Sequence, residues 1–426
     1  MEHALSAAAL DAMFDEHSEY QYTRDLLFSS IVDLMGVVVS KSQPSVHAAF
    51  QAVHDTLPVS ITALYNKLNR TEPGVVAALV RHTADRLAPV ISAMKGQMPP
   101  RLAGFRVRII DGNHLAATER RLEVLRGSIA GPLPGHALVV LDPDLMLAVH
   151  MIPCEDGHAQ ERSLTSQIID KVAAGEVWIA DRNFCTSPLM SGVVDQYAYY
   201  VIRHHANMPI VSAGKLRKRG RTTTGQVFEQ AVTLAKSDGT TMRARRIVIL
   251  LDKPTRDGDT EMAILTNLPA RVANAVAVAE LYRDRWTLET MFQSLTQMLQ
   301  GEIATLGYPQ AALLGFGVAL TAYNVLSTVQ AACVPTSAWR RSRTRCPGTT
   351  SPTRSVRSRR AWPSPSTPTC GSRTRRCPPP RSREKCVVGL PTHWRASSRN
   401  THAVPRSPSP SGLGSPTRLM CPQHGC

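Results

Sequence analysis

The stretch from residue 104 to residue 184 alternates apolar runs, turn residues and one amphipathic segment, and it constrains the fold more than any other part of the chain. "FRVRIID" reads as a strand ending at Asp111, with Gly112-Asn113 as the turn. "HALVVLDPDLMLAVHMI" has the alternation of a hairpin whose bend contains Pro143. "ERSLTSQIIDKVAA" has helical spacing, and "VWIADRNF" is the next apolar strand. The order strand, hairpin, helix, strand predicts an α/β domain.

Two of these strands run directly into an acidic residue. Asp111 ends the first strand, and Asp181 follows the apolar residues 177–180 with no turn residue between. A strand end is commonly solvated, and an exposed carboxylate there needs no further explanation. A carboxylate at the rim of a sheet can also bind a metal, and this segment alone leaves both readings open. In a ribonuclease-H-like sheet the two strands lie side by side, which would bring Asp111 and Asp181 together.

The segments on either side of this α/β region differ from it in the periodicity of their apolar residues. Residues 1–100 have 3.6-type spacing and predict an all-α N-terminal domain, which is either a DNA-binding module or a helical domain with another role. Residues 101–332 would form the main domain, interrupted at about 197–270 by an inserted, mostly-β subdomain. A basic loop in this insertion either contacts DNA phosphates or is a solvated turn. Its candidate contacts are Lys215, Arg217, Lys218 and Arg219.

The formal net charge of +16 suggests a polyanionic partner, but the distribution of charge removes that inference. Residues 333–426 contain seventeen arginines, one lysine and one acidic residue, so the residues before them carry almost no net charge. The same segment holds seven of the nine cysteines and shows neither strand nor helix periodicity. It reads either as a disordered Arg/Pro/Ser-rich tail or as translation out of frame, and the abrupt change of composition favours the second.

The rest of the chain has the features of a cytoplasmic protein. It contains two cysteines, Cys154 and Cys185, and its acidic N-terminus lacks the apolar run of a signal peptide. Residues 303–332 are uncharged and largely apolar. Because polar residues interrupt this run and basic flanks are absent, we expect a buried helix and no membrane span.

The segment "VAVAELYRDRWTLETMFQSLTQML" predicts one amphipathic helix. Its core stripe consists of Leu281, Leu288, Phe292, Leu295 and Leu299. At about 100° per residue, Tyr282, Arg285 and Glu289 share a second stripe at the edge of the buried face. Arg285 and Glu289 have i,i+4 spacing, which by itself describes an ordinary surface ion pair. Trp286 reads as a core residue, and stacking on a flipped base is the alternative.

Asp111, Asp181 and Glu289 would converge if this helix packs across the strand ends. Three neighbouring carboxylates repel one another unless a cation neutralises them. Hard oxygen ligands favour Mg²⁺ or Mn²⁺, and a pair of such ions can activate a water or a 3′-hydroxyl group for attack on a phosphodiester. The three residues therefore predict a two-ion site.

Three motifs together resemble the DDE transposases of bacterial insertion sequences, the fourth insertion-sequence family in particular. They are "IIDGNHLAATERRLEVLRG", "IADRNF" and "YRDRWTLETMFQSLTQ", and the resemblance covers about residues 20–330. The signature of that family is Y-x-x-R-x-x-x-E-x-x-x-x-x-x-K. Tyr282, Arg285 and Glu289 match it in order and spacing, whereas Thr296 stands in place of the lysine.

The resemblance implies a ribonuclease-H-like catalytic domain with Asp111, Asp181 and Glu289 as catalytic and metal-binding residues. Tyr282 and Arg285 would contact the DNA backbone near the cleavage site. The implied activity is phosphodiester cleavage at insertion-sequence ends followed by strand transfer into target DNA. The implied partners are double-stranded DNA and a second copy of the chain, acting in the cytoplasm at the nucleoid.

Three other residues carry open readings. Arg182, beside the expected metal site, either contacts phosphate or belongs to a solvated turn. His114 reads as a packing or hydrogen-bonding histidine rather than a ligand. Thr296 in place of lysine would remove one phosphate contact and weaken binding to the element end.

Two alternatives to a transposase follow from the same residues. A plain ribonuclease-H-like nuclease would share the chemistry, but the inserted strands and the Tyr-Arg-Glu stripe argue against it. A frameshifted, catalytically defective relic would only bind DNA or inhibit full-length copies. It would result if the chain from about residue 333 is out of frame, because packing and dimer contacts after the catalytic helix would then be lost.

Overall fold

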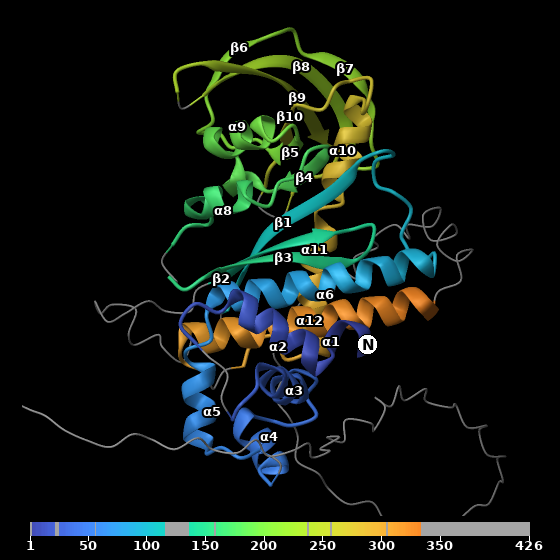
Figure 1. Cartoon of the computed structure of the whole chain (residues 1–426). Coiled ribbons are helices and arrows are strands. Elements are labelled where there is room, and N and C mark those ends of the chain that lie inside the picture. Colours follow the sequence, from blue (N-terminus) through green and yellow to red (C-terminus); the bar gives the residue numbers. More distant parts are fainter. Residues whose placement is uncertain are drawn as a thin grey trace, which may run out of the picture. The chain divides into compact units, whose positions relative to one another are not determined.

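The computed structural model describes residues 2–21, 25–55, 57–115, 136–156, 159–236, 238–255, 258–303 and 306–333 (Figure 1). These residues all fall within the unit Met1–Pro352. Two segments discussed above lie outside the described residues. They are the part of the "IIDGNHLAATERRLEVLRG" motif from residue 116 onward, and the predicted tail beyond Cys333.

The described residues before the first strand form helices. They are α1 (Glu2–Leu5), α2 (Ala7–His17), α3 (Phe28–Val39), α4 (Val46–Val53), α5 (Ile61–Leu68) and α6 (Pro73–Ala93). Ser6, Ser45 and Ser60 cap α2, α4 and α5 with their hydroxyl groups, which satisfy N–H groups at the start of each helix. Helix α6 packs against strand β3 (Leu147–Cys154), and the helices share one hydrophobic cluster with the sheet. Their division into a separate domain stays a prediction.

Five strands form the half of the sheet that carries the aspartates. They are β1 (Arg106–His114), β2 (His136–Asp142), β3, β4 (Glu176–Ala180) and β5 (Tyr199–Arg203), in the spatial order β3-β2-β1-β4-β5. β1 is parallel to β4 and β4 to β5, whereas β2 is antiparallel to both of its neighbours. The predicted mixed α/β fold is confirmed, and this strand order agrees with a ribonuclease-H-like domain.

The prediction that the first strand ends at Asp111 is wrong. β1 continues to His114 because its antiparallel ladder with β2 runs on to the pair of His114 with His136. Its parallel pairing with β4 stops two residues before Asp111, at Ile109. Asp111 and Asp181 therefore lie where β1 and β4 part. Asp181 directly follows the end of β4, whereas Asp111 lies within β1.

The sheet continues beyond β5 through antiparallel strands. They are β10 (Glu261–Thr266), β9 (Thr241–Leu251), β8 (Gly225–Ala235) and β6 (Ile210–Ala213), with β7 (Arg217–Arg221) also paired to β8. The basic segment predicted as a loop is thus an edge strand, which suits its lysine and arginine side chains because charge discourages edge-to-edge association. That these strands form an inserted subdomain stays a prediction.

Short helices cover the face of the sheet opposite α6. They are η2 (Glu161–Leu164), α8 (Thr165–Ile169), η3 (Arg182–Phe184) and α9 (Ser187–Asp195). Alternate strand residues point to the two faces: Ile109 belongs to the cluster with the N-terminal helices, and Ile110 to the cluster with α8 and α9. The helix predicted over residues 161–174 is shorter than expected, because it opens as a 3₁₀ turn and ends at Ile169.

The predicted single helix that carries Glu289 is two helices, α10 (Ala275–Arg283) and α11 (Trp286–Met298). At the break, the N–H groups of Asp284 and Arg285 bond to carbonyl groups three residues back instead of four. The Asp284 carboxylate forms an ion pair with Arg101, which lies before β1, with Nη1 2.9 Å from Oδ1. The break places Arg285 in a turn, directly before the helix that carries Glu289.

Helix α12 (Pro309–Cys333) is the one described helix that is long and apolar enough to cross a membrane, yet 78% of its most apolar window is buried. It packs against α3, α6 and β3 (Figure 1). The Asn324 amide accepts the N–H of Ala148 at 2.8 Å and donates to its carbonyl at 2.9 Å, which fixes α12 on β3. The prediction of a buried helix is confirmed.

Candidate functional site

Asp111 lies on β1 and Asp181 directly follows the neighbouring strand β4, at the point where the two strands part. Asp181 directly follows β4 and caps η3, since its Oδ1 accepts the backbone N–H of Asn183 at 2.7 Å. Asp111 Oδ1 accepts the N–H of Gly112 at 3.0 Å. In each carboxylate a backbone hydrogen bond orients Oδ1.

Arg285 connects Glu289 to Asp111. Its Nη1 lies 2.7 Å from Asp111 Oδ2, and its Nη2 lies 2.5 Å from Glu289 Oε1. The guanidinium group is largely buried, with 16% of the side chain exposed, so the contact with Asp111 is more than a solvated surface pair. The i,i+4 pair predicted from the sequence is present, and Asp111 is a third member that the helical spacing did not reveal.

The electrostatics of the site disfavour its negative charges. Burial is the main cause that raises the pKa of Asp111 to about 6, and Asp181 and Glu161 add to the rise as like charges. The Arg285 guanidinium opposes it. Burial also raises the pKa of the Tyr282 hydroxyl to about 12. A cation bound among these carboxylates would relieve the repulsion between them.

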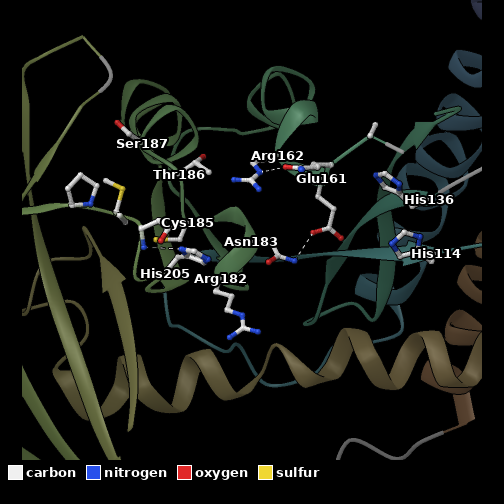
Figure 2. A pocket seen from close by; sticks show the side chains of 15 residues that line it. His114, His136, Glu161, Arg162, Arg182, Asn183, Cys185, Thr186, Ser187 and His205 are labelled. Atoms are coloured by element: carbon white, nitrogen blue, oxygen red, sulfur yellow. Dashed lines mark hydrogen bonds between the residues drawn. The ribbon is translucent and has the colours of Figure 1, made fainter. Parts of the chain in front are cut away.

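Glu161 is a fourth carboxylate in this region that the sequence analysis did not single out. A Cβ atom added to Gly112 would lie 2.0 Å from Glu161 Oε1, so the carboxylate lies directly over the residue after Asp111. Asn183 Nδ2 donates to Glu161 Oε2 at 3.4 Å (Figure 2). Glu161 begins η2, where an acidic residue is common because it complements the helix dipole, and so its sequence position gave no signal of function.

The residues fit a divalent cation by the chemistry of their donors. Asp111, Asp181 and Glu289 offer the hard oxygen ligands that Mg²⁺ and Mn²⁺ prefer. Among the described residues, no group of three His, Cys, Asp or Glu side chains is arranged to hold a metal ion. Arg285 supplies a positive charge between Asp111 and Glu289 instead. A metal bound by Asp111 Oδ2 or Glu289 Oε1 would therefore compete with Arg285 for that oxygen.

The residues predicted to bind DNA occupy three different environments. The side chains of Lys215, Arg217, Lys218 and Arg219 are exposed. Arg219 also pairs with Glu229, with Nε 2.8 Å from Oε2. Arg182 is exposed in η3, directly after Asp181. Tyr282 is buried, with 7% of its surface exposed, and packs in the main hydrophobic cluster.

Trp286 and His114 are both exposed, which contradicts the core interpretation of Trp286 and leaves the packing or hydrogen-bonding role of His114 a prediction. Trp286 is 55% exposed at the start of α11, so its interpretation as a core residue is wrong: the break in the helix turns it outward. His114 is exposed too, and its ring lies 5.4 Å from that of His136, centroid to centroid. Within the predicted core stripe, Phe292 is only partly buried.

Lys41 lies beside Thr296, the position at which the family signature has a lysine. Thr296 is exposed near the end of α11, and its hydroxyl donates to the Phe292 carbonyl. Lys41 Nζ donates to the Thr296 carbonyl at 3.4 Å and to the Gln297 carbonyl at 2.9 Å. An ammonium group thus lies beside Thr296, where a cation also complements the C-terminal end of the helix dipole.

Comparison with known proteins agrees with this fold. The family described as Transposase DDE domain matches residues 104–325, which is more than half of the chain and includes Asp111, Asp181 and Glu289. The chain therefore belongs to the DDE transposase family of bacterial insertion sequences. The match favours a transposase over a relic that only binds DNA.

Two curated relatives are named as transposases. A Sinorhizobium fredii protein is 26% identical over 192 residues, which are 44% of this chain and 51% of the relative. A Geobacillus stearothermophilus protein, named for an insertion sequence element, is 25% identical over 126 residues, 30% of this chain and 32% of the relative. The chain thus spans about half the length of the first relative and about a third of the second.

Proposed function

We propose that this chain is a transposase that cleaves phosphodiester bonds at insertion-sequence ends and joins the freed 3′-hydroxyl group to target DNA. The observation that carries the proposal is the placement of Asp111 and Asp181 where the parallel strands β1 and β4 part, with Glu289 connected to Asp111 through Arg285. Family membership supports the same chemistry.

Each residue of the site has a proposed role. Asp111, Asp181 and Glu289 hold divalent metal ions, which domains of this family use. When bound, such ions activate a water or 3′-hydroxyl group and stabilise the leaving oxygen. Arg285 keeps Asp111 and Glu289 close together before metal and DNA arrive. As the carboxylates bind metal, its guanidinium group becomes available to a DNA phosphate.

The partners follow from this function. Double-stranded DNA is bound at the element ends and at the target, with exposed Arg182 and the Lys215–Arg219 segment as phosphate contacts. Because Tyr282 is buried, it would help to position Arg285, and it would contact DNA only after a local movement. The helices before residue 100 would recognise the end sequence, two copies would form the synaptic complex, and the reaction would take place at the nucleoid.

The direct test of this function uses a supercoiled plasmid carrying the genomic DNA that flanks the gene on both sides. We expect the purified chain with Mg²⁺ to nick the plasmid at the element ends and to produce no nicks in EDTA. Equal nicking with and without a divalent ion, or nicks scattered without regard to the ends, would contradict the proposed function.

Replacing Arg285 by alanine should have opposite effects on metal binding and on catalysis. Without the guanidinium group between Asp111 and Glu289, the affinity for Mn²⁺ in the absence of DNA should rise by about tenfold, because a neighbouring positive charge is lost. Nicking should fall, because a phosphate contact is lost with it. Mn²⁺ titration and the plasmid assay measure the two effects.

Arg283→Ala is the matched control, because Arg283 lies two residues away and pairs with Glu280 instead of the aspartates. Its Mn²⁺ affinity should equal that of the unmodified chain. If Arg285→Ala binds Mn²⁺ no better than the control does, Arg285 does not compete with metal.

Lys41 is expected to provide the positive charge that the sequence lacks at position 296. Lys41→Met should weaken binding to the element end several-fold and lower the slope of log affinity against log salt by about 0.9, the value for one phosphate contact. Adding Thr296→Lys to this variant should restore both. Lys95→Met is the control, since Lys95 also follows a helix with a positive φ of 55°, as Lys41 does with 60°. Without restoration by Thr296→Lys, Lys41 only caps α11.

A further inference from the structure

A polar cavity of about 660 Å³ adjoins the aspartates on the α9 side of the sheet (Figure 2). Its lining comes from η2 and the two residues before it, from η3, from the start of α9 and from the segment after β5, with His114 of β1 and His136 of β2. Its charged and polar side chains include Glu161, Arg162, Arg182, Asn183 and His205. The volume lies within the range of about 300–1,000 Å³ that is typical of ligand pockets.

The cavity begins at the proposed metal site. Asp181 immediately precedes the lining residues Arg182 and Asn183, and its Oδ1 is bonded to the Asn183 backbone. Glu161, whose carboxylate lies over Gly112 beside Asp111, forms another part of the wall. In Figure 2, Glu161 and Asn183 point toward each other and are joined by a hydrogen bond. A DNA strand whose scissile phosphate lies at Asp111 and Asp181 would therefore pass directly into the cavity.

Beyond Glu161 the lining becomes basic. Arg162 and Arg182 are exposed, and neither forms an ion pair with an acidic residue in the described ranges. Arg162 bonds instead to the neutral Gln160 side chain. His205 adds a ring whose Nδ1 accepts the N–H of Asn207 at 3.1 Å. Two arginines without acidic partners beside a carboxylate cluster are suited to an anion that runs past a metal site.

The chemistry of the lining also limits what can be recognised. Among the described lining residues there is no Phe, Tyr or Trp side chain. The only rings among these residues are those of His114, His136 and His205 and of Pro209, and the arginine side chains suit phosphates. Phosphate contacts position a strand without reading its sequence. This is what a site for DNA outside the element requires, because the sequence flanking an element changes with every insertion.

We propose that this cavity binds the phosphodiester backbone of DNA beyond the element end, with Arg162 as a phosphate contact. The inference rests on the proposed cleavage function and deepens it. Two sources supply the same chemistry: the donor DNA that flanks the element before cleavage, and the target DNA that meets the freed end. The donor flank is the occupant we expect, since it is continuous with the strand at Asp181.

The test compares Arg162→Ala with the unmodified full chain on three DNA probes in EDTA, so that binding is measured without cleavage. The probes are an element end with a flank of ten base pairs, the same end cut at its terminus, and the cut end supplied together with target DNA. Arg162→Ala should weaken binding to the flanked end by about five- to tenfold and lower its salt slope by about 0.9. Binding to the cut end should not change.

The other outcomes separate the possible occupants. A loss confined to the probe with target DNA would assign the cavity to the target strand and overturn the donor-flank assignment. No loss on any probe, or an equal loss on all three, would overturn the cavity as a DNA site. If the unmodified chain neither binds nor nicks element ends, the proposed function fails, which is a result distinct from either.

Two further variants guard against a folding artefact. Arg162→Lys keeps the positive charge and should retain most of the affinity for the flanked end. Arg271→Ala removes an exposed arginine from the loop before α10, outside the cavity lining, and should bind all probes as the unmodified chain does. If both variants have the melting temperature of the unmodified chain and Arg162→Lys binds the flanked end as poorly as Arg162→Ala, the positive charge at position 162 does not contact the DNA.

Discussion

Asp181→Asn is expected to abolish Mg²⁺-dependent nicking of element-end DNA, with a loss of at least about 10³-fold, and to leave DNA binding intact. The substitution keeps the size of the side chain and removes the negative charge that holds the metal, which contributes several kcal/mol of transition-state stabilisation. The fold should tolerate the change. The Asn183 N–H, now bonded to Asp181 Oδ1, can bond equally to an amide oxygen, so the start of η3 stays capped. Plasmid nicking and a gel-shift assay measure the two properties.

Asp195→Asn is the matched control for this variant, because Asp195 is exposed at the end of α9 and lies outside the proposed site. It should nick as the unmodified chain does. Nicking by Asp181→Asn at the control rate would remove Asp181 from the catalytic residues, and loss of DNA binding would show that its role is not confined to chemistry.

Arg108→Met should destabilise the fold by about 3–5 kcal/mol, the typical cost of leaving buried carboxylates without their cation. Arg108 is 8% exposed and pairs with both Asp142 and Glu176, which are 7% and 3% exposed. Glu176 Oε2 also accepts the indole N–H of Trp178 at 3.0 Å. Asp142 Oδ1 accepts the backbone N–H groups of Asp144 and Leu145, each at 3.0 Å, so both carboxylates are fixed in place. Urea unfolding measures the free-energy change.

Arg106→Met provides the comparison on the same strand, since Arg106 is exposed two residues before Arg108. Its effect should stay within about 0.5 kcal/mol, as for most surface substitutions. A similar cost for the two variants would mean that the loss at position 108 comes from the strand and not from the buried charges. Because β1 carries Asp111 and β4 leads directly into Asp181, Arg108→Met should reduce nicking at temperatures where it begins to unfold.

The parts of this fold that could be predicted are those that local periodicity determines. Alternation within the strands gave the α/β class, and the uncharged run at 303–332 gave a buried helix, which the structure shows as α12. These features depend on short segments, and tertiary contacts did not change them. The placement of Asp111 beside Asp181 was expected on another ground, because the two strands are neighbours in a ribonuclease-H-like sheet.

The features that the sequence did not reveal depend on contacts between distant segments. β1 extends past Gly112 because β2 continues its ladder, although Gly112-Asn113 is a favourable local turn. The break before α11 involves Asp284, which pairs with Arg101 almost two hundred residues earlier. Helical spacing treats this region as one cylinder and therefore placed Trp286 in the core.

The candidate site divides in the same way. The pair of Arg285 and Glu289 is local and could be predicted from i,i+4 spacing. The contact of Arg285 with Asp111, the carboxylate of Glu161 over Gly112, and Lys41 beside Thr296 all join separate elements. No single motif contains both partners of any of these contacts, so they required the structure.

The most direct test of the central claim, that Asp111, Asp181 and Glu289 hold divalent metal for DNA cleavage, is metal rescue of Asp111→Cys. A thiolate is a softer ligand than a carboxylate and binds Mn²⁺ far better than Mg²⁺. The account predicts that this variant does not nick element-end DNA in Mg²⁺ and regains nicking in Mn²⁺, while Asp111→Ala stays inactive in both. Equal activity of Asp111→Cys in the two metals, or failure of Mn²⁺ to restore any nicking to a correctly folded variant, would contradict it.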